Sequence, residues 1–158
     1  MRRGDRALQG GFTMLVVLAA LFILALGSQQ VMAVASQQAT REREALLQRV
    51  GEAYRSAIRS YYESSPGGVK QWPRALDDLL EDRRFVGTHR HLRELYSDPM
   101  VRAGTWGVVR EPGGGITGVH SLSAGEPIRV VRDAQGVPAR TYADWRFVYE
   151  PPGVVGVR

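Results

Sequence analysis

The sequence contains no cysteine among its 158 residues. Disulfide bonds and thiolate metal sites are therefore excluded, while the cellular compartment stays open because exported bacterial proteins often lack cysteine. The sequence also lacks a block of like charges, since its 21 basic and 16 acidic residues are spread along the chain and give a net charge of +5. Nucleic-acid-binding proteins usually concentrate basic residues on one face, and this sequence predicts no such face.

Patterns for catalysis and metal binding are likewise missing. His89 and His91 lie two residues apart without clustered acids, and such a pair is more often a solvated surface than a metal site. No Gly-x-Ser-x-Gly motif occurs, and residues 111–115 lack the Lys-Ser/Thr that completes a phosphate-binding loop. We therefore expect no enzyme activity and no cofactor. The three tryptophans are interpreted as core or sheet-face residues: Trp72, Trp106 and Trp145.

Charge is absent from one long stretch near the N-terminus, between Arg6 and Arg41. Within residues 12–27 the only polar side chain is that of Thr13. A helix needs about 20 apolar residues to cross the hydrocarbon core of a bilayer, and residues 12–35 supply them. The basic residues 1–11 precede this run, so the positive-inside rule places them in the cytoplasm. The sequence predicts a single-pass transmembrane helix over residues 12–35.

This apolar segment has three competing interpretations. The first is a plain membrane anchor. The second is a secretory signal cleaved after Ala35, because Ala33-Val34-Ala35 fits the small-x-small rule and Ser36 follows it. Two features argue against the second interpretation: a signal of 35 residues is long, and no extended n-region precedes the apolar run. The third interpretation rests on a motif at the start of the run.

That motif is Gly10-Gly11-Phe12-Thr13-Met14-Leu15-Val16, which resembles the start of type IV pilins and pseudopilins. The resemblance implies that a membrane aspartyl peptidase cuts between Gly11 and Phe12 and methylates the new amino group of Phe12. It also implies that the apolar helix first rests in the membrane and later packs against similar helices in a fibre. The residues expected to mediate this assembly are Met14, Leu15, Val16, Leu18, Leu21 and Phe22.

The motif departs from the family pattern at Val16. Family members usually have glutamate at this position, where the carboxylate is thought to attract the methylated amino terminus of a neighbouring subunit. A charge in hydrocarbon is costly, so such a pair is specific and strong. Valine cannot form it. Within the family this departure favours a minor or tip subunit, with a divergent shaft subunit as the alternative.

The chain after the anchor predicts an amphipathic helix over residues 45–63. Apolar side chains fall on one half of a helical wheel with 100° per residue, which is typical of a helix that packs on a sheet. Residues 41–44 break the pattern and are expected to be solvated. The helix should end before Pro66. The predicted inward residues are Leu46, Leu47, Val50, Ala53, Tyr54, Ala57, Ile58, Tyr61 and Tyr62.

The remaining chain predicts an α+β head. Residues 72–81 read as a short helix with Pro73 near its first position, and Asp77 and Asp78 as solvated helix residues. Residues 87–96 read as one or two further turns, with Thr88 as N-cap and Leu92 and Leu95 pointing inward. Strand patterns cover residues 105–110, 116–121, 127–131 and 142–149, and residues 111–115 read as a hairpin turn between the first two. Trp145, Phe147 and Tyr149 alternate with Arg146 and Val148, which is typical of a sheet with one packed face. We expect an antiparallel sheet of three or four strands against the helix of residues 45–62.

The head also resembles type II secretion pseudopilins, in particular the G-like pseudopilins of the general secretion pathway. The resemblance lies in residues 61–68, 71–80, 92–100 and 105–107. It implies a leader (1–11), a polymerisation helix (12–35) and a periplasmic head (36–158) on the bacterial inner membrane. The implied partners are other pseudopilins, the prepilin peptidase and the inner-membrane assembly platform.

The function implied by this resemblance is a subunit of a short periplasmic fibre that drives protein export. Some major pseudopilins hold calcium, but the acids after residue 100 are scattered, so we expect no metal here. Two alternatives stay open. One is a minor type IV pilin in adhesion, motility or DNA uptake, and the other is a membrane-anchored or signal-cleaved periplasmic binding domain.

Overall fold

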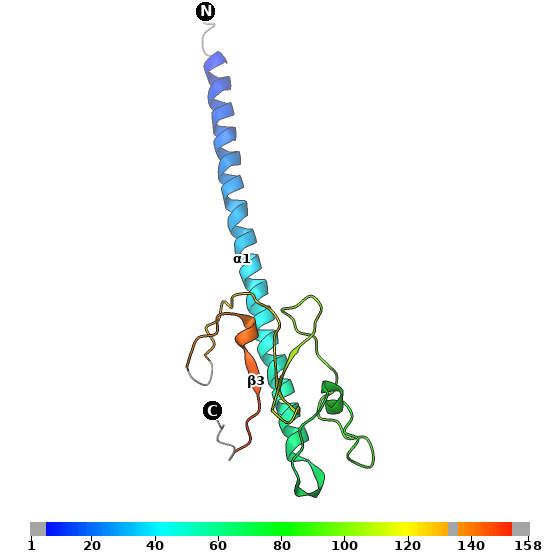
Figure 1. The fold of residues 1–158 in the computed structure, drawn as a ribbon. Helices are drawn as coiled ribbons and strands as arrows, with labels where there is room; N and C mark the ends of the chain where they lie inside the picture. Colours follow the sequence, from blue (N-terminus) through cyan, green and yellow to red (C-terminus); the bar gives the residue numbers. More distant parts are fainter. Residues whose placement is uncertain (1–5, 133–135, 153–158) are drawn as a thin grey trace, which may run out of the picture. The chain divides into compact units, whose positions relative to one another are not determined.

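The computed structural model describes the backbone of residues 6–132 and 136–152, and the side chains of residues 12–23, 36–132 and 136–152. The chain divides into two compact units, Met1–Thr40 and Arg41–Arg158. Helix α1, Arg6–Glu63, contributes to both units, and the remaining elements lie in the second (Figure 1). The structure is therefore α+β, as the sequence predicts.

The first unit is described as helix alone. It carries no proline between Arg6 and Thr40 and is rich in leucine and alanine, which favour the helical state. Within the described residues, no helix holds a stretch long and apolar enough to cross a membrane. The described apolar residues 12–23 cover about 18 Å at a rise of ~1.5 Å per residue, whereas the hydrocarbon core is about 30 Å thick. The side chains that continue the predicted span, residues 24–35, lie outside the described residues.

The second unit begins with the C-terminal half of α1, whose amphipathic pattern is confirmed. Leu47, Tyr54 and Ile58 are almost completely buried, and they lie on the predicted face. Leu46 was predicted inward but is 43% exposed. The packed stripe of the helix is thus narrower than the wheel predicted.

The sheet has the order β1-β2-β3 and is antiparallel throughout. Its strands are β1 (Gly107–Arg110), β2 (Ile116–His120) and β3 (Arg146–Val148). The turn between β1 and β2 is closed by a bond from Glu111 N to Gly115 O of 3.0 Å, which confirms the predicted hairpin. In β3, Phe147 is buried and Arg146 exposed, and Trp145 just before it is buried, so the predicted alternation is confirmed.

The predicted strand over residues 127–131 is wrong. None of residues 127–131 is in a strand, and the nearest pairing is an isolated bridge between Arg132 and Pro138. The backbone N–H of Ile128 donates instead to Glu44 Oε1 on α1, at 2.6 Å. A side-chain carboxylate therefore takes the bond that a neighbouring strand would have accepted.

The predicted helix over residues 72–81 is reduced to a single 3₁₀ turn, η2 (Leu76–Leu79), which follows another short turn, η1 (Pro66–Gly68). The carboxylate of Asp78 accepts bonds from the N–H groups of Arg74 and Ala75, so this acid acts as a cap and is not a freely solvated helix residue. The N–H groups of His91 and Leu92 both donate to Leu79 O at 2.9 Å. These bonds close the turn and end the helical conformation.

The turns predicted for residues 87–96 are also not helical. Leu92 is buried as predicted, but Leu95 is 41% exposed. The segment before β3 forms a third 3₁₀ turn, η3 (Tyr142–Asp144), whose Asp144 carboxylate accepts the N–H groups of Arg140 and Thr141. This capping shortens the predicted strand over residues 142–149.

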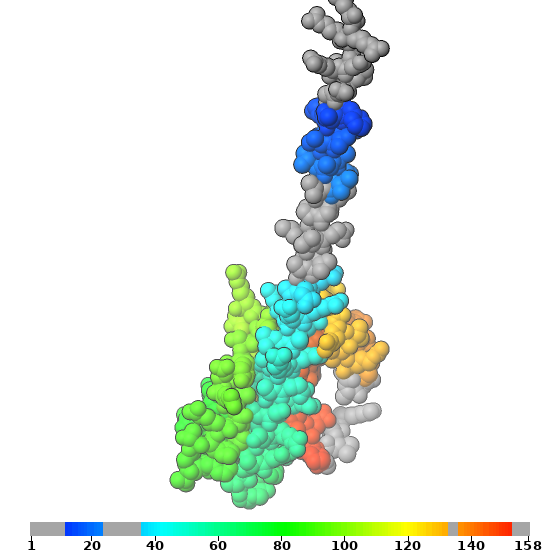
Figure 2. Space-filling view, turned by 180° about the vertical axis from the view of Figure 1, so that it is seen from behind, coloured from blue at the N-terminus to red at the C-terminus, as the bar shows by residue number. Residues whose placement is uncertain are grey.

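One continuous core joins α1 to the sheet. Leu79, Leu92, Ile116, Val119 and Phe147 pack against the buried face of the helix. Trp145 is buried, and Trp72 and Trp106 pack against the core from its border, as predicted. In Figure 2 the segment around residues 70–110 flanks one side of α1, and the segments leading to and following β3 flank the other.

Candidate functional site

The predicted assembly residues all lie on α1 and all expose their side chains. Their exposed fractions are large for apolar groups and range from 49% at Val16 to 68% at Leu15. Phe12, the predicted methylation residue, is 71% exposed. Leucine and phenylalanine side chains lose about 1.5–3 kcal/mol each when they stay in water instead of being buried. This part of α1 therefore presents apolar surface on every side. The members described are Phe12, Met14, Leu15, Val16, Leu18, Leu21 and Phe22.

The predicted cleavage site lies inside α1, since the backbone of Gly10, Gly11 and Phe12 is helical. Each glycine weakens a helix by about 1 kcal/mol relative to alanine. Two adjacent glycines therefore make this the easiest point at which the first turns of α1 can unwind. An extended backbone, which a peptidase requires, is accessible here at low cost. Residues 1–5 of the predicted leader lie outside the described residues.

A buried hydrogen-bond network holds the loop of residues 82–91 against the end of α1. Arg84 binds the fully buried carboxylate of Asp82 in a two-pronged contact, Nε to Oδ1 at 2.8 Å and Nη2 to Oδ2 at 2.6 Å. The same guanidinium donates to Ser65 Oγ and Tyr61 O, both at 2.8 Å, and stacks 3.6 Å from the Tyr61 ring centre. His91 Nε2 lies 3.1 Å from Asp82 Oδ2.

His91 was predicted to be solvated, and this prediction is wrong because its side chain is completely buried. His91 Nδ1 lies 2.8 Å from Ser60 Oγ on α1. An ionised carboxylate can only accept hydrogen bonds, so His91 donates from Nε2 to Asp82 and the hydroxyl of Ser60 donates to Nδ1. The second histidine of the pair, His89, is exposed and contacts the His91 ring edge at 4.8 Å between ring centres.

Hydrogen bonds thus link Ser60 to His91 and His91 to Asp82, in the serine–histidine–aspartate order that serine hydrolases use for catalysis. Two features show that this hydrogen-bonded triad is not a nucleophilic site. Arg84 already neutralises the Asp82 carboxylate, which weakens the imidazole as a base. Ser60 lies within α1, where backbone N–H groups are bonded inside the helix, so none of them is free to form an oxyanion hole. We interpret the triad as a structural connection between the loop of residues 82–91 and α1.

The pKa directions in this network follow from burial and charge. Burial of Asp82 favours its neutral form, but the hydrogen bonds from Arg84 and His91 outweigh burial and lower the pKa of the carboxyl well below its usual range. Burial lowers the pKa of His91, and the hydrogen bond to Asp82 only partly opposes this. At neutral pH the network therefore holds an ionised Asp82, a charged Arg84 and a neutral His91.

Glu44 forms a second buried connection. Residues 41–44 were predicted to be solvated, which is wrong for Glu44 because it is 3% exposed. Its Oε1 accepts the Tyr142 hydroxyl at 2.9 Å and the N–H of Ile128 at 2.6 Å. Burial and the bond to this carboxylate raise the pKa of Tyr142 to about 12. Glu44 thereby ties α1 to two segments far along the chain.

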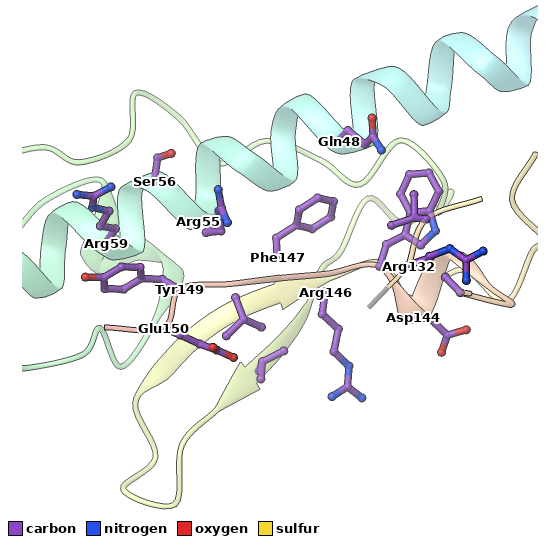
Figure 3. A pocket seen from close by; sticks show the side chains of 15 residues that line it. Gln48, Arg55, Ser56, Arg59, Arg132, Asp144, Arg146, Phe147, Tyr149 and Glu150 are labelled. Carbon is purple, nitrogen blue, oxygen red and sulfur yellow. The ribbon is translucent and has the colours of Figure 1, made fainter. Parts of the chain in front are cut away.

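A groove runs between α1 and β3, and we call it the β3 groove (Figure 3). Its third side is formed by Val131, Arg132 and Ala139. Its volume is about 790 Å³. The lining residues are Gln48, Arg55, Ser56 and Arg59 on α1, Val109 on β1, Val131, Arg132 and Ala139 on the third side, and the run Asp144, Trp145, Arg146, Phe147, Val148, Tyr149 and Glu150.

No family model, curated protein or solved structure matches this chain. A functional proposal therefore depends on the residues themselves and on the geometry above. Within the described part of the chain, no three histidine or acidic side chains lie close enough together to hold a metal ion.

The sequence did not reveal the buried polar residues that organise this unit. Glu44, Asp82 and Asp98 are each at most 3% exposed. The Oδ2 atom of Asp98 accepts the hydroxyl of Ser121 at 2.7 Å. Their partners lie far along the sequence: Tyr142 is 98 positions from Glu44, His91 is 9 from Asp82, and Ser121 is 23 from Asp98. Only the position of Glu44 next to an apolar helix face hinted at burial.

Proposed function

We propose that the chain is a pseudopilin-like subunit that polymerises through the apolar half of α1 and displays the α+β unit on the fibre. The observation that carries this proposal is the exposed apolar surface of residues 12–23, which begins directly after Gly10-Gly11. Exposed apolar surface of this extent requires either lipid or neighbouring helices to cover it. A fibre subunit uses both in turn, first lipid and then its neighbours.

Localisation follows from the same residues. We place the protein in the bacterial inner membrane as a single-pass precursor, with residues 1–11 in the cytoplasm and the α+β unit in the periplasm. The proposed partners are other pseudopilins, the prepilin peptidase that cuts before Phe12, and the inner-membrane assembly platform. In this function the chain performs no chemistry of its own, because export is driven by assembly of the fibre.

The continuity of α1 favours this proposal over release of a soluble domain. The helix passes through Ala35 and Ser36 without interruption. A peptide bond inside a helix has its backbone groups already bonded to the turns before and after it, and no glycine lies within seven residues on either side of Ala35 to loosen it. The bond after Gly11 has two glycines beside it.

Val16 favours a minor or tip position within the fibre. Its side chain is 49% exposed on α1, and none of residues 12–23 carries a charge. A subunit without this carboxylate cannot attract the amino terminus of a neighbouring subunit, but its own amino terminus can still bind the glutamate of another subunit. A minor type IV pilin shares this reasoning and is the second candidate function.

Replacement of Gly11 by lysine tests the proposal. We expect Gly11→Lys to accumulate as uncut precursor when the chain is expressed with a prepilin peptidase, because a bulky charged side chain then precedes the scissile bond. Gly10→Lys is the matched control, since it changes the neighbouring glycine of the same helix and should still be cut. The processed fraction is measured by gel mobility and mass spectrometry.

Ala35→Lys completes this experiment. Under the proposal it leaves processing unchanged. If Ala35→Lys abolishes processing while Gly11→Lys does not, the segment is a secretory signal and the pseudopilin proposal is wrong.

A further inference from the structure

Within residues 6–132 and 136–152, β3 has one edge without a neighbouring strand. It is the last strand in the order β1-β2-β3. Tyr149 N–H donates to Thr117 O at 3.0 Å, and Phe147 lies opposite Val119 in the same register. Because backbone groups alternate between the two sides of an antiparallel strand, the N–H and C=O groups of Arg146 and Val148 point away from β2. Among the described residues, no backbone hydrogen bond reaches them.

The β3 groove borders this free edge, with α1 as the opposite wall (Figure 3). The groove residues on α1 extend from Gln48 to Arg59, which is about 16 Å at a rise of ~1.5 Å per residue. An extended segment of five residues has about this length at ~3.3 Å per residue. The groove therefore has the length of one short added strand.

The polar groups of the groove select for negative charge. Four arginines line it, Arg55, Arg59, Arg132 and Arg146, against the two acids Asp144 and Glu150. Arg55 and Arg59 are already paired with Glu52 and Glu63 on α1, so the positive charge without an ion pair to a described residue is that of Arg132 and Arg146. The Asp144 carboxylate is already used by the N–H groups and hydroxyl of its cap. Arg146 has an exposed side chain and forms no ion pair within 4.0 Å with a described residue.

One of the lining residues, Trp145, carries a buried hydrogen-bond donor that lacks an acceptor among the described residues. Trp145 lines the groove and is 2% exposed, and its Nε1 is the buried side-chain atom without a partner in the described part of the chain. An unsatisfied buried donor costs about 1–3 kcal/mol.

We propose that the β3 groove binds an extended, acidic segment of a partner protein, which joins the sheet as a fourth strand beside β3. Its backbone pairs with Arg146 and Val148, and its acidic side chains face the arginines. Strand addition is an established way for an exposed edge to bind a peptide. This inference does not depend on the proposed function, because every groove residue lies between Gln48 and Glu150.

Charge argues against a second copy of the same chain as the occupant. Two β3 edges paired around a two-fold axis would place Arg146 near Arg146 of the other copy. Like charges opposite each other destabilise a strand pair. An acidic segment instead gains from the same arginines.

The test uses the full chain in detergent micelles and a fluorescein-labelled probe peptide, Glu-Val-Glu-Val-Glu, followed by fluorescence anisotropy. We expect saturable binding of this peptide and none of Lys-Val-Lys-Val-Lys. A third probe keeps the acidic sequence but carries N-methyl groups on the two valines. It should bind about tenfold more weakly, because each lost hydrogen bond costs about 0.5–1.5 kcal/mol.

Protein variants separate edge pairing from simple charge attraction. Arg146→Glu and Val148→Pro should each weaken binding of the acidic probe about fivefold or more. Val148→Pro does so because it removes a backbone donor on the free edge. Arg102→Glu is the matched control, since Arg102 is exposed and outside the groove, and it should leave binding unchanged.

The proposal is overturned if the lysine or N-methylated probes bind as well as the acidic one, or if Arg102→Glu weakens binding as much as Arg146→Glu. It is also overturned if the probe binds only after the chain is cut back to residues 1–152. That result would identify the chain's own C-terminal residues as the occupant. A dimer that forms through the groove without any probe would identify a second copy.

Discussion

At the scale of single residues, close contacts set requirements that a sequence pattern does not reveal. Gly51 lies on the buried face of α1, and a Cβ atom at this position would overlap the ring of Phe147. The helical wheel predicted an apolar face here but not that one position must be empty. Phe147 is buried against the helix only because residue 51 has no side chain.

Gly51→Ala should destabilise the protein, although alanine is normally the better helix former by about 1 kcal/mol. Overpacking a core costs about 1–3 kcal/mol, so we expect a net loss in the free energy of unfolding. Urea unfolding of the detergent-solubilised chain, followed by tryptophan fluorescence, measures it. Ser56→Ala, at an exposed position of the same helix, is the control and should be neutral or stabilising. Equal stabilisation by both variants would show that the Phe147 contact is not restrictive.

The network around Asp82 predicts a loss of stability in acid. The pKa of Asp82 is lower in the folded than in the unfolded chain, so its contribution is present above the ordinary value of about 3.9 and is lost as pH falls through the folded value. The pKa of His91 is also lowered, so the unfolded chain gains a proton first, below about pH 6.5. Both groups therefore make the free energy of unfolding fall from pH 7 towards pH 3.

Asp82→Asn tests this assignment. Removing one partner of a buried ion pair costs about 3–5 kcal/mol, so we expect a loss of that order at pH 7 and a flatter pH dependence below pH 4. Asp77 is an exposed acid in η2, so Asp77→Asn should change neither the free energy of unfolding at pH 7 nor its pH dependence. An unchanged pH profile in Asp82→Asn would contradict the assignment. The measurement is urea unfolding at several pH values.

At the scale of elements, the regular patterns were predictable and the polar contacts were not. The 3.6-residue period of α1 and the alternation around Phe147 both identified the packed faces, because apolar burial repeats with the backbone geometry. The segment of residues 127–131 has an equally apolar sequence, but Glu44 accepts its Ile128 N–H. Such a contact joins positions 84 residues apart, and no local pattern encodes it.

Glu44→Gln should loosen this segment without unfolding the sheet. A hydrogen bond to a charged group contributes about 1.5–3 kcal/mol, and the amide retains an oxygen but loses the charge. We expect faster hydrogen exchange at Ile128 N–H and unchanged protection at Val119 N–H, in the centre of β2. Glu52→Gln removes a carboxylate from an exposed position of the same helix, and should alter neither rate. Equal acceleration at both amides in Glu44→Gln would mean that Glu44 supports the whole unit.

At the scale of the whole molecule, the α+β class and an antiparallel sheet of three or four strands were predicted from the sequence, and the sheet has three. The groove could not, because it is formed by an edge of β3 and a face of α1 that come from opposite ends of the chain. The motif before Phe12 was visible in the sequence alone. Its proposed role depends on recognition by a separate peptidase, so the fold of this chain does not reveal it.

The most direct test of the proposed function is the mass of the N-terminal peptide of the mature protein, purified from a bacterium that contains a prepilin peptidase. The proposal predicts a chain that begins at Phe12, carries one added methyl group on its amino terminus and fractionates with the inner membrane. A mature chain that begins at Ser36 and fractionates with soluble periplasmic proteins would contradict it.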